Sequence, residues 1–122
     1  MSKFFRILFF AVLLLQIGCN KKFNSRDWKN TTQEDNLNKN NDKNLMIDDL
    51  VKSELLIGKS SKEVKILLGK PNFYDSQKNS FQYETFEDFG WNIDPKFYRG
   101  IEIYFNEDSI VTSTKIYEIK TR

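Results

Sequence analysis

The chain of 122 residues contains no histidine, one cysteine, two prolines and five glycines. Without histidine it lacks the side chain most used as a general base, as a metal ligand and as a switch near neutral pH. A single cysteine excludes an intramolecular disulfide and any cysteine-cluster metal site. So few prolines and glycines exclude collagen-like and proline-rich low-complexity chains. We therefore expect a protein that is not an enzyme and that holds no metal and no cofactor.

A large excess of charge of either sign is also lacking. The chain has 19 Lys and Arg residues against 17 Asp and Glu residues, which gives a net charge of +2. Lys3 and Arg6 lie in a segment that we expect to be removed, so the mature chain would carry 17 charges of each sign. Such a balance gives no electrostatic footprint for nucleic acid, and we expect no nucleic-acid partner.

Residues 1–18 have the pattern of a secretory signal peptide. Lys3 and Arg6 form a short basic region, and the run 7–15 is apolar without interruption. A basic region, an apolar core of about 7–15 residues and a small residue at the cleavage site are typical of such signals. An uncleaved anchor helix is the alternative, but a membrane span needs about 20 apolar residues and this run is shorter.

The end of this segment, Ile17-Gly18-Cys19, resembles the lipobox of bacterial lipoproteins. The resemblance implies that Cys19 becomes the first residue of the mature chain and carries lipid, including palmitate. Acylation is also an economical use for a lone cysteine that has no disulfide partner. Two lipid signals, such as two acyl chains, are enough to hold a protein stably in a membrane. We expect a protein that is anchored by lipid in the bacterial cell envelope.

A polar segment follows, and it differs sharply in composition from the rest of the chain. Eight of the residues in the range 20–44 are asparagines, and Phe23, Trp28 and Leu37 are the only apolar ones. Such a sequence cannot bury enough apolar surface to offset the entropy of ordering. The range 19–44 is therefore predicted to be a disordered, Asn-rich tether. Phe23 and Trp28 would then form a short binding motif, lie in the membrane interface or have no role.

From residue 45 to residue 122 the pattern becomes that of a globular domain. A first helix is predicted over about 45–56, with Asn44 as N-cap and two aspartates, Asp48 and Asp49, in the first turn. Its apolar residues fall at helical spacing. These residues are Ile47, Leu50, Val51 and Leu55.

A second helix is predicted over about 60–68 by signals at both of its ends. Ser60 and Glu63 have the spacing of a capping box, in which each side chain accepts a hydrogen bond from the other residue's backbone N–H. Gly69 suits the positive φ that often ends a helix, and Pro71 prevents its continuation. The helix thus follows a turn that contains Gly58.

Three strands are predicted after this helix, over 81–85, 101–105 and 110–119, with a hairpin turn over 106–109. The last strand has no cleanly apolar face, which indicates a bulge or an edge position. The fold class is therefore α+β, with two N-terminal helices packed on a three-stranded antiparallel sheet.

The order of these elements and the string from Gly58 to Pro71 resemble the SmpA/OmlA domain of the BamE-like family of small outer-membrane lipoproteins. The residues that carry the resemblance are Gly58, Ser60, Glu63, Gly69 and Pro71. The resemblance implies that the domain binds or scaffolds another envelope protein without catalysis, for example in outer-membrane protein assembly. It also implies a location on the outer membrane, facing the periplasm. Related folds also serve as inhibitor modules, so a periplasmic inhibitor or ligand-binding module is the alternative.

The segment between the first two predicted strands is the candidate partner-binding site. Long connections that are not hairpins are usually functional or disordered, and this one is too aromatic for disorder. Aromatic and arginine side chains dominate the binding energy of protein interfaces. The candidate contact residues are Phe89, Trp91, Phe97, Tyr98 and Arg99. Trp91 is expected to be exposed at the centre of the contact, whereas Phe86 and Phe97 could instead belong to the core.

Overall fold

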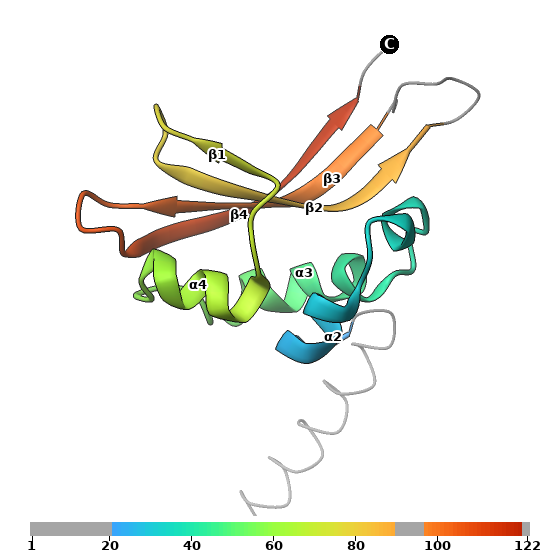
Figure 1. Cartoon of the computed structure of the whole chain (residues 1–122), viewed down its shortest axis with the longest axis horizontal. Helices are drawn as coiled ribbons and strands as arrows, with labels where there is room; N and C mark the ends of the chain where they lie inside the picture. Colours follow the sequence, from blue (N-terminus) through green and yellow to red (C-terminus); the bar gives the residue numbers. More distant parts are fainter. Residues whose placement is uncertain (1–20, 90–96, 121–122) are drawn as a thin grey trace, which may run out of the picture.

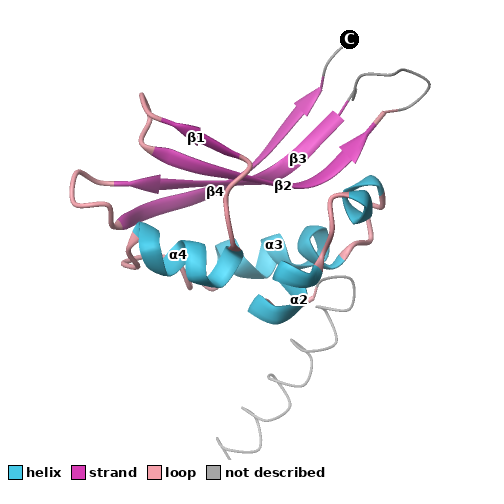
Figure 2. Cartoon of the chain, viewed as in Figure 1, coloured by secondary structure: helices cyan, strands magenta, loops and turns pink. Residues whose placement is uncertain are grey.

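The computed structural model describes residues 21–89 and 97–120. They form an α+β fold in which helices lie against one face of a four-stranded antiparallel sheet (Figures 1 and 2). The helices are α2 (Ser25–Asn30), the 3₁₀ helix η1 (Glu34–Leu37), α3 (Asp42–Lys52) and α4 (Ser61–Leu68). The strands are β1 (Phe73–Asp75), β2 (Ser80–Asp88), β3 (Phe97–Phe105) and β4 (Val111–Lys120), adjacent in the order of the chain.

The predicted α+β class is confirmed, but the number of elements was wrong. The described residues contain a fourth strand, β1, and a third α-helix, α2, in addition to the expected elements. β1 has only three residues, which is too short for an alternating pattern to stand out in the sequence. It is a strand because it pairs with β2, with Tyr74 opposite Phe81.

The signals predicted for α4 are confirmed at both ends. Ser60 Oγ accepts a hydrogen bond from the Glu63 N–H at 3.1 Å, and the Glu63 carboxylate accepts one from the Ser60 N–H at 3.3 Å. Gly69 has φ +83° and ψ −164°, a region that is essentially restricted to glycine. Gly58 also has a positive φ, +86°, and its N–H donates to Val111 O, which ties the turn before α4 to β4.

Helix α3 begins and ends earlier than predicted. Its N-cap is Asn41, whose side chain accepts a hydrogen bond from the Asn44 N–H. Asn44 itself lies inside the helix, so the predicted cap was wrong. Several asparagines here could serve as caps, and tertiary contacts select one of them: the Asn41 amide also donates to Thr85 O at 2.7 Å. The sequence alone contains no sign of that contact with β2.

The prediction of a disordered tether is wrong for residues 21–44, which pack against the domain. Asn24 caps α2, and Trp28 on α2 is completely buried. Its ring lies 6.0 Å from that of Phe23 and 6.3 Å from that of Tyr83, measured between ring centroids. A single large aromatic side chain can bury as much surface as several small ones without producing any periodic pattern. Counting periodic apolar residues therefore underestimated this segment.

The contact between α2 and α4 also satisfies the end of α4. The last carbonyl groups of a helix have no partner within the helix. Here three side chains of α2 and one of β2 donate to the four carbonyl groups at positions 66–69. The pairs are Lys29 to Ile66, Ser25 to Leu67, Trp28 to Leu68 and Tyr83 to Gly69. The N-terminal segment is thus part of the hydrogen-bonded structure of the domain.

The sheet contains two irregularities that the sequence pattern had indicated in part. The pairing of β3 with β4 shifts next to Tyr104 and Phe105, and β4 is also the edge strand of the sheet. The bulge and the edge position both explain why β4 has no cleanly apolar face. A second shift lies in β2 between Glu84 and Phe86. The core side chains of the sheet pack against the helices; they are Phe81, Tyr83, Ile101, Ile103, Phe105 and Val111.

Candidate functional site

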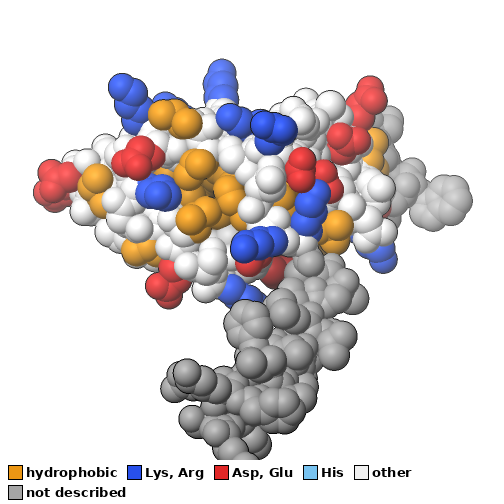
Figure 3. Space-filling view, turned by 90° about the horizontal axis from the view of Figure 1, so that it is seen from below, with side chains coloured by type: hydrophobic (Ala, Val, Ile, Leu, Met, Phe, Trp, Pro, Cys, Tyr) orange, Lys and Arg blue, Asp and Glu red, His pale blue; other side chains and the backbone are white. Residues whose placement is uncertain are grey.

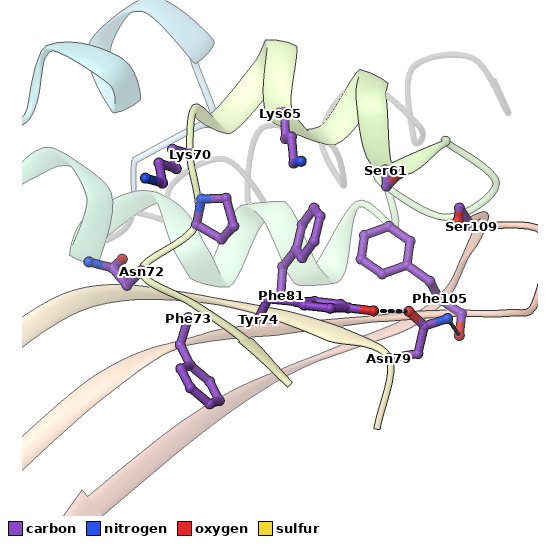
Figure 4. Close-up of a pocket in the computed structure, with 11 residues that line it drawn as sticks. Ser61, Lys65, Lys70, Asn72, Phe73, Tyr74, Asn79, Phe81, Phe105 and Ser109 are labelled. Carbon is purple, nitrogen blue, oxygen red and sulfur yellow. Dashed lines mark hydrogen bonds between the residues drawn. The ribbon is translucent and has the colours of Figure 1, made fainter. Parts of the chain in front are cut away.

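A groove of about 650 Å³ lies between α4 and the β1 edge of the sheet (Figure 4). Phe81 and Phe105 form its floor, and both are largely buried. Lys65 extends toward these rings from α4, while Lys70 lies beside Pro71 at one end (Figure 4). The groove is therefore an apolar surface with cationic side chains on its helical wall and at one end.

The local sequence explains why this space stays open. Gly69 and Pro71 end α4 abruptly, and the chain then crosses to β1 instead of covering the rings. The ring of Phe81 lies 4.6 Å from that of Phe105 and 5.9 Å from that of Tyr74. Edge-to-face pairs of this kind are favourable beyond the area that they bury. Three rings thus make one continuous apolar surface.

The far end of the groove is fixed by hydrogen bonds between two turns. The Tyr74 hydroxyl donates to Asn79 Oδ1 at 3.3 Å. The Asn79 amide donates in turn to Phe105 O at 3.3 Å and to Asn106 O at 2.9 Å. These bonds hold the β1–β2 turn against the β3–β4 turn (Figure 4). The groove therefore has a preformed shape.

The charges that line the groove are of one sign. Among the described residues that line it, Lys65 and Lys70 are the only charged ones, and none carries a carboxylate. Lys65 Nζ lies 5.4 Å from the centroid of the Phe81 ring, within the range of a cation–π contact. Within the described ranges 21–89 and 97–120, neither lysine lies in an ion pair. Both ammonium groups are thus free to meet an anionic partner.

Arg99, one of the predicted contact residues, is held inside the fold. Its guanidinium donates to Asn44 Oδ1 at 2.7 Å and lies 3.5 Å from the carboxylate of Asp48 and 3.4 Å from that of Glu118. Only 18% of its side chain is exposed. Because these bonds join α3 to β3 and β4, Arg99 has a structural role in the described protein.

The other predicted contact residues are divided between different surroundings. Phe97 and Tyr98 are half-buried in β3, and the ring of Phe97 lies 5.8 Å from that of Phe86. Phe89 lines a second hollow, of about 660 Å³, together with Leu37 and other residues of η1. Trp91 lies outside the described residues, as does Cys19. The described members of the set therefore have different surroundings: Arg99 is held by ion pairs, Phe97 lies beside Phe86, and Phe89 lines the second hollow.

A further apolar surface lies on the side of the helices. Figure 3 shows hydrophobic side chains gathered near the middle of this face, bordered by Lys, Arg, Asp and Glu. Ile66 on α4 is 62% exposed, and Leu55 and Ile57, which follow α3, are about 40% exposed. Single exposed aliphatic residues are common on protein surfaces. These three side chains line neither the groove beside β1 nor the hollow at Phe89, so this surface is a weaker candidate than the groove.

The opposite face of the sheet carries acidic groups of two kinds. Glu102 is only 3% exposed and accepts hydrogen bonds from Ser80, Gln82 and Tyr104. Burial alone would raise the pKa of Glu102, but these hydrogen bonds outweigh it and lower the pKa below its ordinary value. Its charge is thus stabilised by neighbours on β2 and β3. Such a fully bonded carboxylate stabilises the sheet and is poorly suited to catalysis.

Glu84, on the same face, gives a testable pH dependence. Burial, then a hydrogen bond with Glu87 and repulsion from it, raise the pKa of Glu84 to about 7 from 4.5. The folded state therefore binds this proton more tightly than the unfolded chain. The contribution of protonated Glu84 to the stability of the fold is complete below about pH 4.5 and is lost as the pH rises through about 7.

We expect the urea concentration at the unfolding midpoint to decrease as the pH rises from 5 to 8. In Glu84→Gln this decrease should be smaller. Glu107→Gln, in the exposed β3–β4 turn, is the matched control and should keep the wild-type difference. An unchanged pH dependence in Glu84→Gln would show that another group causes it.

Sequence reasoning placed the partner contact after β2 and missed the groove. The available signal was Phe73 and Tyr74, two large rings directly after the Gly69–Pro71 helix end. Both are more than half exposed in the structure.

Comparison with known proteins identifies no family for this chain. No model of a known protein family matches it, and no curated protein matches it in sequence. Within residues 21–89 and 97–120, no helix has the length and hydrophobicity needed to cross a membrane.

Proposed function

We propose that this protein is a lipid-anchored bacterial envelope protein that binds a second envelope protein without catalysing a reaction. The observation that carries the binding role is the preformed apolar groove beside β1, with its floor of aromatic rings and its two lysines. Hollows of this kind, apolar with a few placed polar groups, are the usual sites of recognition. The lipobox-like sequence that ends at Cys19 supports the lipid anchor.

The resemblance to the SmpA/OmlA domain supports the same proposal. The capping box and the Gly69–Pro71 helix end, on which the resemblance depends, have the local geometry that the sequence predicted. The proposed location is the outer membrane, facing the periplasm, and the proposed partner is a component of outer-membrane protein assembly.

A ligand-binding module is the second candidate, and the size of the groove favours it. A volume of about 650 Å³ lies within the range of about 300–1,000 Å³ that is usual for small-molecule sites. The two candidates differ in what occupies the groove in the cell.

A photo-crosslinking residue placed at Tyr74 tests the binding role. We expect light to join the full-length protein to one discrete envelope protein in living cells. The matched control is the same residue at Ile119, which is also about half exposed but lies on the opposite edge strand. Capture of a protein from Tyr74 alone supports the proposal. No adduct from Tyr74, or the same adducts from both positions, contradicts it and leaves the ligand-binding candidate.

The lipid anchor has a separate test. Cys19→Ala should give a protein without lipid, which either keeps residues 1–18 or is no longer attached to the membrane. Intact mass of the wild type should show a chain that begins at Cys19 and carries acyl groups. A wild-type mass that begins at Met1 without lipid would contradict the anchor and leave the binding role untouched.

A further inference from the structure

We propose that the groove between α4 and β1 binds an extended segment of the partner that adds to the sheet beside β1 and places carboxylates against Lys65 and Lys70. This inference rests on the proposed protein-binding function and specifies the chemistry of the partner. Three features of the groove support it: a free strand edge, an apolar floor and two lysines.

The free edge is that of β1. The strand is the first of the sheet and pairs with β2 on one side only. Among the described residues, no backbone hydrogen bond reaches positions 73–75 from the other side. An unpaired edge is a ready template for an added strand, whose main-chain hydrogen bonds supply affinity. β1 is short and carries no proline or lysine that would block such pairing.

The two faces of β1 define where the side chains of an added strand would go. Tyr74 pairs with Phe81 and contacts it on the groove side, whereas Phe73, which also lines the groove, pairs with Gln82 and extends its ring toward the other face of the sheet (Figure 4). Alternate side chains of a strand point to opposite faces. Every second side chain of an added segment would therefore lie over the rings of Tyr74 and Phe81, and apolar residues fit there.

Charge complementarity decides the polar part of the segment. Lys65 and Lys70 flank the apolar floor, and none of the described residues that line the groove carries a carboxylate. A basic segment would be repelled, and a neutral one would leave both ammonium groups unpaired. Asp or Glu beside the apolar residues would pair with them. A second copy of this chain fits less well, because two three-residue strands cannot bury the roughly 1,200 Å² of a stable interface.

The probe is a phage library of random linear seven-residue peptides, selected on the full-length protein purified in detergent. We expect enriched peptides to carry apolar residues two positions apart and at least one Asp or Glu. The affinity of an enriched peptide is then measured by fluorescence anisotropy. Lys65→Glu/Lys70→Glu should weaken it at least about tenfold, because like charges would then face each other.

The matched control is Lys52→Glu/Lys62→Glu, which changes the net charge equally at exposed positions outside the groove. It should change the affinity less than about twofold, and melting temperatures of both pairs establish that they fold. Amide hydrogen exchange should also slow at positions 73–75 when the peptide binds. Enrichment without acidic residues, equal effects of the two lysine pairs, or unchanged exchange in β1 would each overturn the inference.

Two other occupants are distinguished by the same variants. Binding of the wild type to vesicles of phosphatidylserine and phosphatidylcholine, lost in Lys65→Glu/Lys70→Glu with no peptide selected, would assign the groove to a membrane surface. A dimer that the same variant dissociates in sedimentation would assign it to a second copy. Either outcome overturns the peptide inference. A crosslinked envelope protein at Tyr74 without any selected acidic peptide would leave the proposed function standing and reject this inference alone.

Discussion

Replacing Trp28 with alanine is expected to lower the free energy of unfolding by about 3–5 kcal/mol. The side chain is completely buried between α2, α4 and the sheet, against the rings of Phe23 and Tyr83. Its indole N–H also donates to Leu68 O at 3.1 Å. The variant thus loses apolar burial and leaves a helix-end carbonyl without its partner. Few other single changes in this protein should be as damaging.

Urea unfolding followed by tyrosine and tryptophan fluorescence measures this effect. Leu37→Ala is the matched control, because Leu37 lies in the same N-terminal segment but is 58% exposed. It should change the free energy by less than about 0.5 kcal/mol. If Trp28→Ala fails to fold, Trp28→Phe should give a smaller, measurable loss. A Trp28→Ala variant as stable as the wild type would return residues 21–44 to the status of a flexible tether.

The sequence predicted α4 well because its signals are local. The capping box joins residues three apart, and Gly69 and Pro71 act on their own backbone. Local chemistry of this kind needs no knowledge of the rest of the fold. β2 and β3 were predicted for a related reason, since alternation along one strand indicates a half-buried sheet. β4 lacks a cleanly apolar face and was predicted from its β-branched residues and the turn before it.

The N-terminal segment could not be predicted in this way, because its order comes from contacts far away in the chain. Trp28 and Ser25 bond to the end of α4, about 40 residues later. Lys21 bridges the carboxylates of Asp27 and Asp42 at 2.9 and 3.1 Å. An asparagine-rich composition gives no hint of such pairings. The same limit applies to Asn41, which was chosen as a cap by its contact with Thr85.

The candidate site shows a similar division. The end of α4 at Gly69 and Pro71 was predicted correctly. The groove beside it, however, exists only because β1 and two turns come together around it. Arg99 was expected at an interface because of its residue type. Its neighbours Asp48, Asn44 and Glu118 come from other elements, and they turn it into an internal link. Residue type alone gave no sign of these internal contacts.

Gly100→Ala is expected to lower the free energy of unfolding by about 2–3 kcal/mol, near the upper end of the range for overpacking. A Cβ atom at Gly100 would collide with the carbonyl oxygen of Tyr83 and would lie 2.6 Å from the hydroxyl oxygen of Tyr117. Tyr117, opposite Gly100 in β4, lays its ring across β3, where burial raises its pKa. By backbone propensity alone, alanine in a strand would be favoured over glycine by roughly 0.5–1 kcal/mol. The sign of the measured change therefore decides which effect dominates.

A double-mutant cycle with Tyr117→Leu separates the two collisions. Removing the phenol should relieve the contact with the Tyr117 ring, so Gly100→Ala should cost less in the Tyr117→Leu background, by about 1 kcal/mol or more. Part of the loss should remain, because the Tyr83 carbonyl belongs to the backbone and cannot move without disturbing β2. Urea midpoints of the four proteins give the coupling. If Gly100→Ala stabilises the protein, or if the cycle shows no coupling, then Tyr117 does not lie over Gly100. The face of the sheet that no helix covers would then be open at this position.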